Sequence, residues 1–428
     1  MSRTRTTLTA VGGSLVCAVV IAAAPSSAAP PPVPATGHPA SAAAAAFAPT
    51  VGMPGQYDGI TDVPGVQVGQ VQATTAPYLT GTTVVYFPQM SVAGVDQRGG
   101  APATKETDLL SPLNSNPGVN AIQLGGSSMY GLEATNGVIR WLEDRGEGVP
   151  LGPVGVAPIV PAADIYDLGR GGDIKARTTA EWGYLAAQAV SDGPVRQGTV
   201  GGGTGANSGG YKSGVGTASV YLGNGIYVGA IVVVNSAGSA VDPKDCSLLA
   251  ARLGLGDEFA GLQTPTAAEC HPSAAAADDN ALNTTIAVVA TNAPLEKAAA
   301  ERLSGNAHDG MARAISPIHT LADGDTVFGV STGSGTPLRN NNPADGRTLN
   351  GIYSAGADAL SRAIVKAILS AESVGNRTSY CDRYPSACAD LAALPTWRTQ
   401  GSAPEVTPKA FKQATKALQI IPVPKPGK

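Results

Sequence analysis

Asn283 and Thr284 form a polar pair where an irregular segment meets an apolar, β-branched run. A hydroxyl at such a junction can attack the preceding carbonyl, and hydrolysis of the resulting ester leaves Thr284 with a free α-amine. That amine has an ordinary pKa of about 7.7–8.0, against about 10.4 for lysine, so it is the better base near neutral pH. The pair is therefore a candidate autocleavage site and nucleophile. On these residues alone, a turn residue at the start of a strand is the stronger explanation.

A second candidate nucleophile is Ser331, in a segment that matches the G-x-S-x-G elbow of α/β-hydrolases. That fold requires the acid and the histidine to follow the serine along the chain. All four histidines precede Ser331: they are His38, His271, His308 and His319. The chain order therefore excludes the elbow and favours a glycine-bounded strand end.

The sequence offers no convincing cofactor or metal site. The glycines over 201–216 match neither G-x-x-x-x-G-K-[ST] nor G-x-G-x-x-G, so they indicate a tight loop instead of a phosphate site. His308 and His319 are eleven residues apart and lack the spacing of a zinc site, and His308 is expected to lie on a helix surface or in packing. We predict no cofactor and no metal.

The first 56 residues have the composition of an export signal followed by a linker. Two arginines, Arg3 and Arg5, precede an apolar stretch over 8–24, and small residues over 26–29 offer a cleavage site. We predict a signal peptide over 1–29 and a Pro/Ala-rich linker over 30–56. A retained anchor is disfavoured because the apolar stretch is short for a span of about 20 residues. The protein is then secreted, with no stable membrane insertion after signal removal.

The cysteines agree with export. Removal of Cys17 with the signal leaves an even set, which outside the cytosol indicates two disulfides. Four cysteines allow three disulfide connectivities. We expect the pairing Cys246–Cys270 and Cys381–Cys388, because it closes the shorter loops. A zinc site is the alternative, but the chain has no C-x-x-C pair and few histidines.

Composition excludes other classes of protein. Only 14% of the 428 residues are charged, the formal net charge is −4, and no long basic run occurs. A nucleic-acid partner would need a basic footprint, so none is predicted. Hydrophobic residues reach 43%, which argues against disorder throughout the chain.

The elements that must position these residues alternate between strands and helices. Strands are expected over 82–87, 227–234, 285–291 and 326–331 because these runs are short, β-branched and bounded by turn residues. Helices are expected over 130–144, 178–190, 295–315 and 357–374, and irregular structure over 256–282. This alternation predicts an α/β layered domain. The tail beyond about residue 403 is expected to be peripheral.

Several separated motifs, in this order, resemble the P1 peptidases, the self-processing group of D-aminopeptidases, β-aminopeptidases and nylon-oligomer hydrolases. The resemblance covers about 57–374. Its motifs lie at 59–66, 82–88, 105–110, 124–127 and 137–143, then at 203–212, 232–235, 283–295, 307–313 and 323–326.

The resemblance implies a four-layer αββα sandwich of the N-terminal nucleophile type. It implies self-cleavage before Thr284 into an α chain over 57–283 and a β chain over 284–428, which stay folded as one unit. Five residues are expected to act with Thr284. Lys212 lowers the pKa of the amine, Asp323 and Asp325 orient the amine and Lys212, Asn235 is the oxyanion donor, and Tyr166 is an assisting group. The family is usually oligomeric, so a homo-oligomer is expected.

Thr284, together with Lys212 and the Asp323-Gly324-Asp325 pattern, looks closer to the nylon-oligomer hydrolase branch of this family. The aminopeptidase branch tends to have Ser and Glu around the positions that correspond to Asp323 and Asp325. The expected reaction is hydrolysis of a small peptide or amide. An endo-amidase acting on 6-aminohexanoate oligomers, an aminoacyl transferase on the same site, and an uncleaved secreted binding protein remain alternatives. The sequence leaves open the substrate, oligomer size, signal cleavage position and trimming of 256–282.

Overall fold

The computed structural model describes residues 50–270 and 282–419, which belong to one compact unit. The predicted signal peptide, residues 30–49 of the linker, and residues 271–281 lie outside the described residues. The linker was predicted to run to residue 56, and this is wrong at its end. Gly52 and Met53 already form backbone hydrogen bonds with Tyr221, at 2.8 and 2.9 Å.

Strand β12 (Thr284–Thr291) lies at the centre of the molecule, and all eight of its residues are buried. Its side chains alternate between two hydrophobic cores. Ile286 and Val288 face one core and Ala287 and Val289 face the other. A strand with both faces buried lies between two layers of the fold. The β-branched residues of β12 are typical of such a strand.

The strands form one continuous, mixed sheet of nine strands in the order β10-β11-β12-β13-β2-β4-β7-β3, with β1 paired to β2. Strands β12 and β13 follow the Asn283–Thr284 bond in the chain, yet they lie between β11 and β2, which precede it. The bounds are β1 Gln67–Ala73, β2 Thr80–Gln97, β3 Thr104–Lys105, β4 Val119–Gly125, β7 Ala162–Asp164, β10 Val215–Gly223, β11 Ile226–Asn235 and β13 Thr326–Ser331. Two short hairpins stand apart: β5 (Val149–Pro150) with β6 (Val156–Ala157), and β8 (Asn207–Ser208) with β9 (Tyr211–Lys212).

Strand β2 is long enough to serve both halves of this sheet. Its first part pairs with β1 and β4, and its last six residues pair with β13. The register with β4 shifts between Tyr86 and Ser91, where the strand passes from one half to the other. The two halves therefore stack on each other, with Phe87 of β2 and Val288 of β12 in the core between them.

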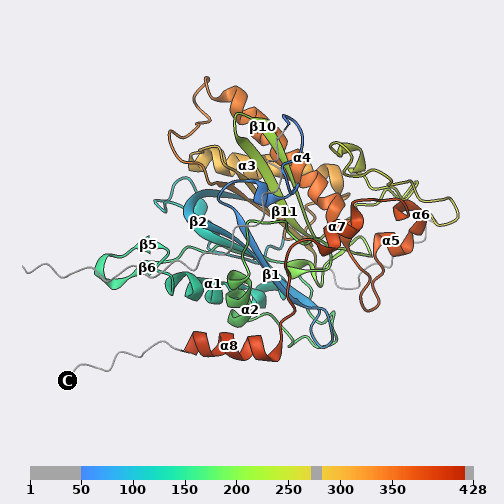
Figure 1. The fold of residues 1–428 in the computed structure, drawn as a ribbon, viewed down its shortest axis with the longest axis horizontal. Coiled ribbons are helices and arrows are strands. Elements are labelled where there is room, and N and C mark those ends of the chain that lie inside the picture. Colours follow the sequence, from blue (N-terminus) through green and yellow to red (C-terminus); the bar gives the residue numbers. More distant parts are fainter. Residues whose placement is uncertain (1–49, 271–281, 420–428) are drawn as a thin grey trace, which may run out of the picture. The chain divides into compact units, whose positions relative to one another are not determined.

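Helices cover the outer faces of both halves. Helices α3 (Lys297–Ala314) and α4 (Gly346–Ser370) pack on β10 to β13, and α1 (Ala134–Glu143) and α2 (Ala180–Gln188) pack on β1, β2 and β4. Figure 1 shows the two helix pairs on opposite sides of the strands. The molecule is thus an αββα sandwich, which confirms the predicted fold class.

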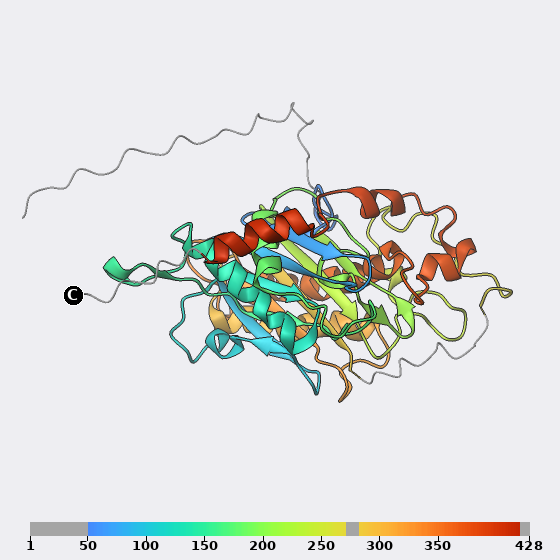
Figure 2. The ribbon, with the colours of Figure 1, turned by 90° about the horizontal axis from the view of Figure 1, so that it is seen from below.

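The last described helices lie outside these layers: α5 (Tyr380–Arg383), α6 (Pro385–Cys388), α7 (Leu394–Thr399) and α8 (Pro408–Gln419). Phe411 of α8 is partly buried and packs against the core beneath α1 and α2, and Thr415 donates a 3.1 Å hydrogen bond to Glu181 of α2. Figure 2 shows α8 along the outer side of this layer. Within the described residues, no helix is long and apolar enough to cross a membrane.

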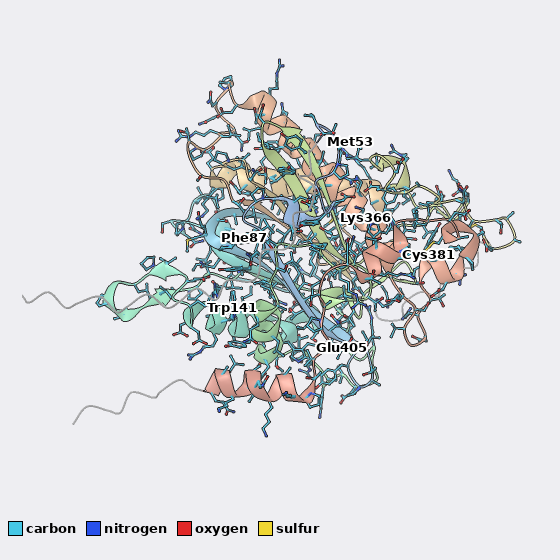
Figure 3. All side chains as sticks on the ribbon, in the orientation of Figure 1. Met53, Phe87, Trp141, Lys366, Cys381 and Glu405 are labelled. Carbon is cyan, nitrogen blue, oxygen red and sulfur yellow. A yellow bond between two sulfur atoms is a disulfide. The ribbon has the colours of Figure 1, made fainter. Side chains whose placement is uncertain are left out.

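Helix α4 carries two fully buried cations that tie distant segments together. Arg362 donates to Asp58 at 2.7 Å and to Glu258 at 2.5 and 2.6 Å. Lys366, which is labelled in Figure 3, contacts the same two carboxylates. Buried charges are tolerated when each has a partner, as here. The cluster joins a helix that follows residue 284 to two segments that precede it.

Both predicted cysteine pairs lie at disulfide distance. The S–S separation is 2.03 Å for Cys246–Cys270 and 2.06 Å for Cys381–Cys388. The first pair lies entirely before the Asn283–Thr284 bond and the second entirely after it. Neither disulfide would therefore link the two fragments that cleavage of this bond produces.

The predicted strands over 285–291 and 326–331 are confirmed, and that over 227–234 lies within β11. The strand expected over 82–87 is shorter than the observed one, because β2 continues to Gln97. Pro88 and the polar residues after it indicated that the strand ends there. Helix α4 begins eleven residues before its predicted start at 357, in an exposed polar turn without apolar periodicity.

Candidate active site around the Asn283–Thr284 bond

The backbone around Asn283 is fixed by the loop that leads into β13. Its N–H donates to the carbonyl of Ala322 at 2.9 Å, and its carbonyl accepts from the N–H of Gly324 at 3.0 Å. Asn283 is thus in parallel bridge pairing with Asp323. These bonds orient the carbonyl group of the Asn283–Thr284 peptide and place a donor on its oxygen.

The hydroxyl of Thr284 lies against that same carbonyl group and donates to its oxygen. Both Asn283 and Thr284 are buried, so bulk water has little access to the bond. The loop can approach this closely because residue 324 is glycine: a Cβ there would lie 2.9 Å from the Thr284 Oγ1. Gly324 is a site residue that the sequence interpretation missed, since the Asp-Gly-Asp pattern drew attention only to its carboxylates.

Asp323 and Asp325 accept hydrogen bonds from different segments near Thr284. Asp323 accepts hydrogen bonds from the Ala237 N–H at 3.0 Å and from the hydroxyl of Thr320 at 2.5 Å. Asp325 accepts from the N–H of Thr285 at 2.7 Å. Burial raises the pKa of Asp323, and its hydrogen bonds oppose that rise. The Asp325 carboxylate therefore holds the backbone directly after Thr284, whereas the Asp323 carboxylate holds the segment after β11 and the turn at Thr320.

His319 is a further partner that the sequence did not reveal. Its N–H and its Nδ1 both donate to Asp325 Oδ2, at 3.0 and 2.8 Å. Its ring packs edge-on against His308, with centroids 4.8 Å apart. His308 is fully buried, and burial lowers its pKa to about 4. His308 is thus a neutral packing residue at pH 7, as predicted, and His319 fixes one oxygen of Asp325.

Asn235 ends β11 directly opposite Thr284 in the antiparallel ladder, so the two side chains lie on one face of the sheet. Its Oδ1 accepts from Arg170 at 2.5 Å and from the N–H of Asn207 at 3.0 Å, and its Nδ2 donates to the Tyr166 carbonyl at 3.3 Å. These bonds orient the amide nitrogen. Arg170 was not among the predicted residues, because nothing in its local sequence marks it.

Lys212 lies in β9, paired with Asn207 of β8, which in turn contacts Asn235. Its ammonium donates to the carbonyl of Gly203 at 3.1 Å and to that of Ser213. Burial and the nearby Arg170 charge lower the pKa of Lys212 to about 7. The structure thus connects Lys212 to Thr284 through Asn207 and Asn235.

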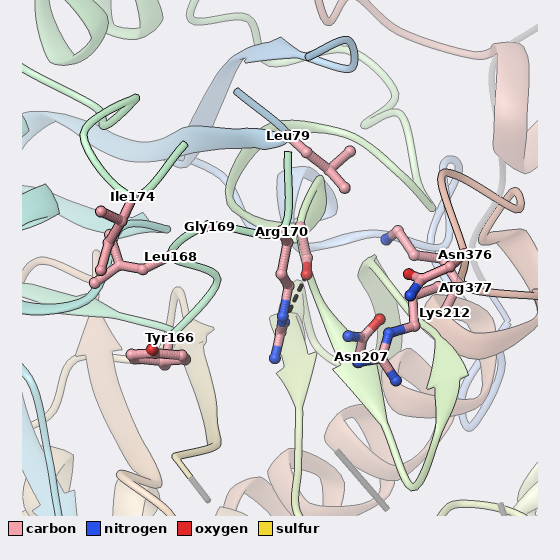
Figure 4. Close-up of a pocket in the computed structure, with 11 residues that line it drawn as sticks. Leu79, Tyr166, Leu168, Gly169, Arg170, Ile174, Asn207, Lys212, Asn376 and Arg377 are labelled. Carbon is pink, nitrogen blue, oxygen red and sulfur yellow. Dashed lines mark hydrogen bonds between the residues drawn. The ribbon is translucent and has the colours of Figure 1, made fainter. Parts of the chain in front are cut away.

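A cavity of about 390 Å³ opens beside these residues. Figure 4 shows Leu168 and Ile174 on one side, Lys212, Asn207, Asn376 and Arg377 on the other, and Arg170 between them. The full lining is Leu79, Tyr166, Leu168, Gly169, Arg170, Ile174, Gly205, Asn207, Lys212, Asn376 and Arg377. Three lining residues, Tyr166, Arg170 and Asn207, contact Asn235, which is paired with Thr284 across the ladder of β11 and β12.

Among the described residues, no group of three or more His, Cys, Asp or Glu side chains is arranged to hold a metal ion. The polar groups around Thr284 instead comprise a hydroxyl, carboxylates, an amide, an amine and backbone donors. This set can carry out nucleophilic attack on a carbonyl and proton transfer.

The fold is similar to that of solved aminopeptidases. The L-aminopeptidase D-Ala-esterase/amidase of Ochrobactrum anthropi, described as a variant of the Ntn hydrolase fold, aligns with a TM-score of 0.58 and 25% identity over 78% of this chain and 92% of that one. A β-aminopeptidase of Burkholderia sp. aligns with a TM-score of 0.58 and 23% identity over 81% of this chain and 97% of that one. The molecule therefore has the architecture of Ntn-type amide hydrolases.

The chain belongs to peptidase family S58, whose model matches residues 58–380. An uncharacterized aminopeptidase of Mycobacterium leprae is 45% identical over 78% of this chain and 96% of its own length. A 6-aminohexanoate-oligomer endohydrolase of Kocuria sp. is 32% identical over 63% of this chain and 74% of its own length. The resemblance inferred from the motifs is confirmed, and so is the enzyme class, an amide hydrolase.

Proposed function

We propose that the chain is the precursor of a secreted amide hydrolase that cuts its own Asn283–Thr284 bond and then uses Thr284 as an N-terminal nucleophile. The observation that supports this most directly is the contact between the Thr284 hydroxyl and the Asn283 carbonyl, whose oxygen also accepts the Gly324 N–H at 3.0 Å. A nucleophile and an oxyanion donor thus meet at one peptide bond.

In the first reaction, Thr284 Oγ1 attacks the carbonyl carbon of Asn283. The Gly324 N–H stabilises the charge that develops on the oxygen. The C–N bond breaks, the nitrogen takes up the proton that the hydroxyl lost, and Asn283 is held as an ester on Thr284. Water hydrolyses the ester and releases the Asn283 carboxylate and a Thr284 residue with a free amine and a free hydroxyl.

In the second reaction, the α-amine accepts the hydroxyl proton while Oγ1 attacks the amide carbonyl of the substrate. The amine product leaves with that proton, and water hydrolyses the acyl ester. Asn235 Nδ2, which carries two hydrogens, is positioned by Tyr166 and Arg170 to donate to the oxyanion. The Asp325 carboxylate holds the backbone after Thr284, the Asp323 backbone pairs with Asn283 before it, and positive charge on Lys212 lowers the pKa of the amine.

The substrate is a small peptide or amide, and the enzyme is of the aminopeptidase or amidase type. The relatives include proteins named aminopeptidases and a 6-aminohexanoate-oligomer endohydrolase, so exo- and endo-acting forms are both compatible with the family. The mature protein consists of the two fragments folded together, as a homo-oligomer, and acts outside the cell after signal removal.

Gel electrophoresis of the purified protein tests this proposal. Wild-type protein should give two bands, and N-terminal sequencing of the smaller fragment should start at Thr284. The two bands should appear with and without reductant, because each disulfide lies within one fragment. Thr284→Ala should give one uncut, inactive band, while Thr284→Ser, which keeps a hydroxyl, should still be cut. An active, unbroken wild-type chain would refute the proposal.

A further inference from the structure

We infer that the backbone of residues 322–324, against which Asn283 lies in the uncut chain, is the subsite that binds the acyl part of the substrate. We call this backbone the acyl subsite. The ligand that fits it is an α-aminoacyl group whose nitrogen is itself acylated, as it is inside a peptide. The inference rests on the proposed function, because it takes the Asn283–Thr284 bond as the first substrate of the Thr284 hydroxyl, and it names the substrate class.

Asn283 is held on the acyl subsite in the pattern of a parallel strand pair. Its N–H donates to the carbonyl of Ala322 at 2.9 Å, and its carbonyl accepts from the N–H of Gly324 at 3.0 Å. One residue thus spans both partners, and the distance between them matches the nitrogen and the carbonyl of a single α-amino acid. A β-amino acid has one more methylene group between its nitrogen and its carbonyl, so it cannot form both bonds in this register.

The nucleophile faces the carbonyl of the residue that occupies the acyl subsite. Thr284 Oγ1 contacts the same Asn283 oxygen that accepts the Gly324 N–H. Self-cleavage and substrate hydrolysis both require a carbonyl carbon within reach of this one hydroxyl. A substrate residue in the place of Asn283 brings its carbonyl there, where Gly324 donates to the oxygen and Asn235, opposite Thr284, supplies a second donor.

The acyl subsite is held in place by contacts that do not involve Asn283. The N–H of Asp323 donates to the carbonyl of Thr320 at 3.1 Å, and its carbonyl accepts from the N–H of Ala101 at 2.8 Å. Its carboxylate accepts from the N–H of Ala237 at 3.0 Å. The subsite therefore keeps its shape when Asn283 leaves.

Self-cleavage itself favours the departure of Asn283. Hydrolysis places a negative charge on a residue that is only 9% exposed, which is unfavourable, and Leu282 before it is already 46% exposed. Departure leaves the carbonyl of Ala322 and the N–H of Gly324 without their partner. Because buried backbone groups are costly when unpaired, a substrate that restores both bonds gains affinity from them.

The surroundings of the Asn283 nitrogen favour an acylated substrate nitrogen over a free ammonium group. In the uncut chain this nitrogen belongs to an amide, and its one hydrogen bonds to the carbonyl of Ala322. The exposed Leu282 shows that the acylating group can extend toward solvent. The carboxylates of Asp323 and Asp325 already accept hydrogen bonds from other donors. An ammonium group with the Ala322 carbonyl as its acceptor would be poorly compensated for its burial.

Turnover of matched p-nitroanilides by the processed wild-type enzyme tests the inference. N-acetyl-L-alanyl p-nitroanilide is compared with O-acetyl-L-lactoyl p-nitroanilide, in which an oxygen replaces the N–H. Because the carbonyl of Ala322 then loses its donor, we expect kcat/KM to fall about tenfold. The free L-alanyl and the N-acetyl-β-alanyl p-nitroanilides should each be about tenfold poorer than the N-acetyl-L-alanyl compound. Equal kcat/KM for the alanyl and lactoyl compounds, or preference for the free amine or the β-alanyl compound, would overturn the inference.

Substitutions at position 283 give a second readout, because one subsite is inferred to serve both reactions. Precursors with Asn283, Asn283→Ala and Asn283→Leu are refolded, and their self-cleavage rates are measured on gels. The order of these rates should match the order of kcat/KM for the N-acetyl p-nitroanilides of asparagine, alanine and leucine, and a reversed order would overturn the inference. The matched control is Leu321→Ala, a 91% exposed side chain next to the subsite, which should change neither order. An uncut wild-type chain would refute the proposed function, whereas a cut, active enzyme without these preferences would overturn this inference alone.

Discussion

Replacement of Gly324 by alanine tests the geometry of the proposed cleavage site directly. The added Cβ would lie 2.9 Å from Thr284 Oγ1 and 2.7 Å from the Ala101 carbonyl oxygen, whereas an ordinary contact begins near 3.4 Å. The hydroxyl and the loop must therefore separate by about half an ångström. Because a misplacement of about 1 Å can cost about 10²-fold in rate, we expect self-cleavage to slow by about tenfold to a hundredfold. Overpacking of this kind should also cost about 1–3 kcal/mol of stability.

The cleavage rate is measured by refolding denatured precursor and following the two fragments on gels. Stability is measured by urea unfolding in the Thr284→Ala background, where cleavage does not complicate the comparison. The matched control is Gly351→Ala in α4, whose Cβ would have no heavy atom within 4 Å and which should cleave at the wild-type rate. If Gly324→Ala folds and also cleaves at the wild-type rate, the Thr284 hydroxyl does not act from the position seen here.

Two further outcomes follow from the buried charges. Asp325→Asn leaves one acceptor oxygen for the N–H of Thr285 and the two donors of His319. We expect a loss of about 1–3 kcal/mol in urea unfolding and slower cleavage on gels, and wild-type behaviour would contradict the role given to Asp325. The lowered pKa of Lys212 means that between pH 7 and 10.5 the unfolded chain holds a proton that the folded chain has lost. Stability in the Thr284→Ala background should therefore rise with pH in this window, by at most about 1.4 kcal/mol per pH unit. Addition of Lys212→Met should flatten that rise, and an unchanged slope would refute the assignment.

The sequence predicts the parts of this molecule that depend on local pattern. The β-branched run after Thr284 predicts β12, because only such a run suits a strand buried on both faces. The two short cysteine loops predict the pairs that the structure brings together. The roles proposed for Asn235, Lys212, Asp323 and Asp325 came from the resemblance, since no local pattern distinguishes them from turn or surface residues.

The remaining features depend on segments that meet only in three dimensions. Arg170 reaches Asn235 across 65 residues of sequence, and its own neighbours show no periodicity that marks a site. His319 has a positive φ of 59° and contacts Asp325, and neither feature follows from the residues around it in the sequence. The sequence did not predict the full length of β2. This strand crosses between the two stacked halves of the sheet, so the face that it buries changes along its course.

The order of strands in the sheet has a consequence for the lifetime of a cut molecule. Strands β12 and β13 are flanked by β11 and β2, so release of the later fragment requires two ladders to open, with eight and six paired residues. Each released piece would expose unpaired strand edges that invite aggregation. Reassembly would be bimolecular and would slow on dilution, whereas the uncut precursor folds as one chain. Once cut, the protein should therefore persist because it unfolds slowly, and a brief denaturation should inactivate it permanently.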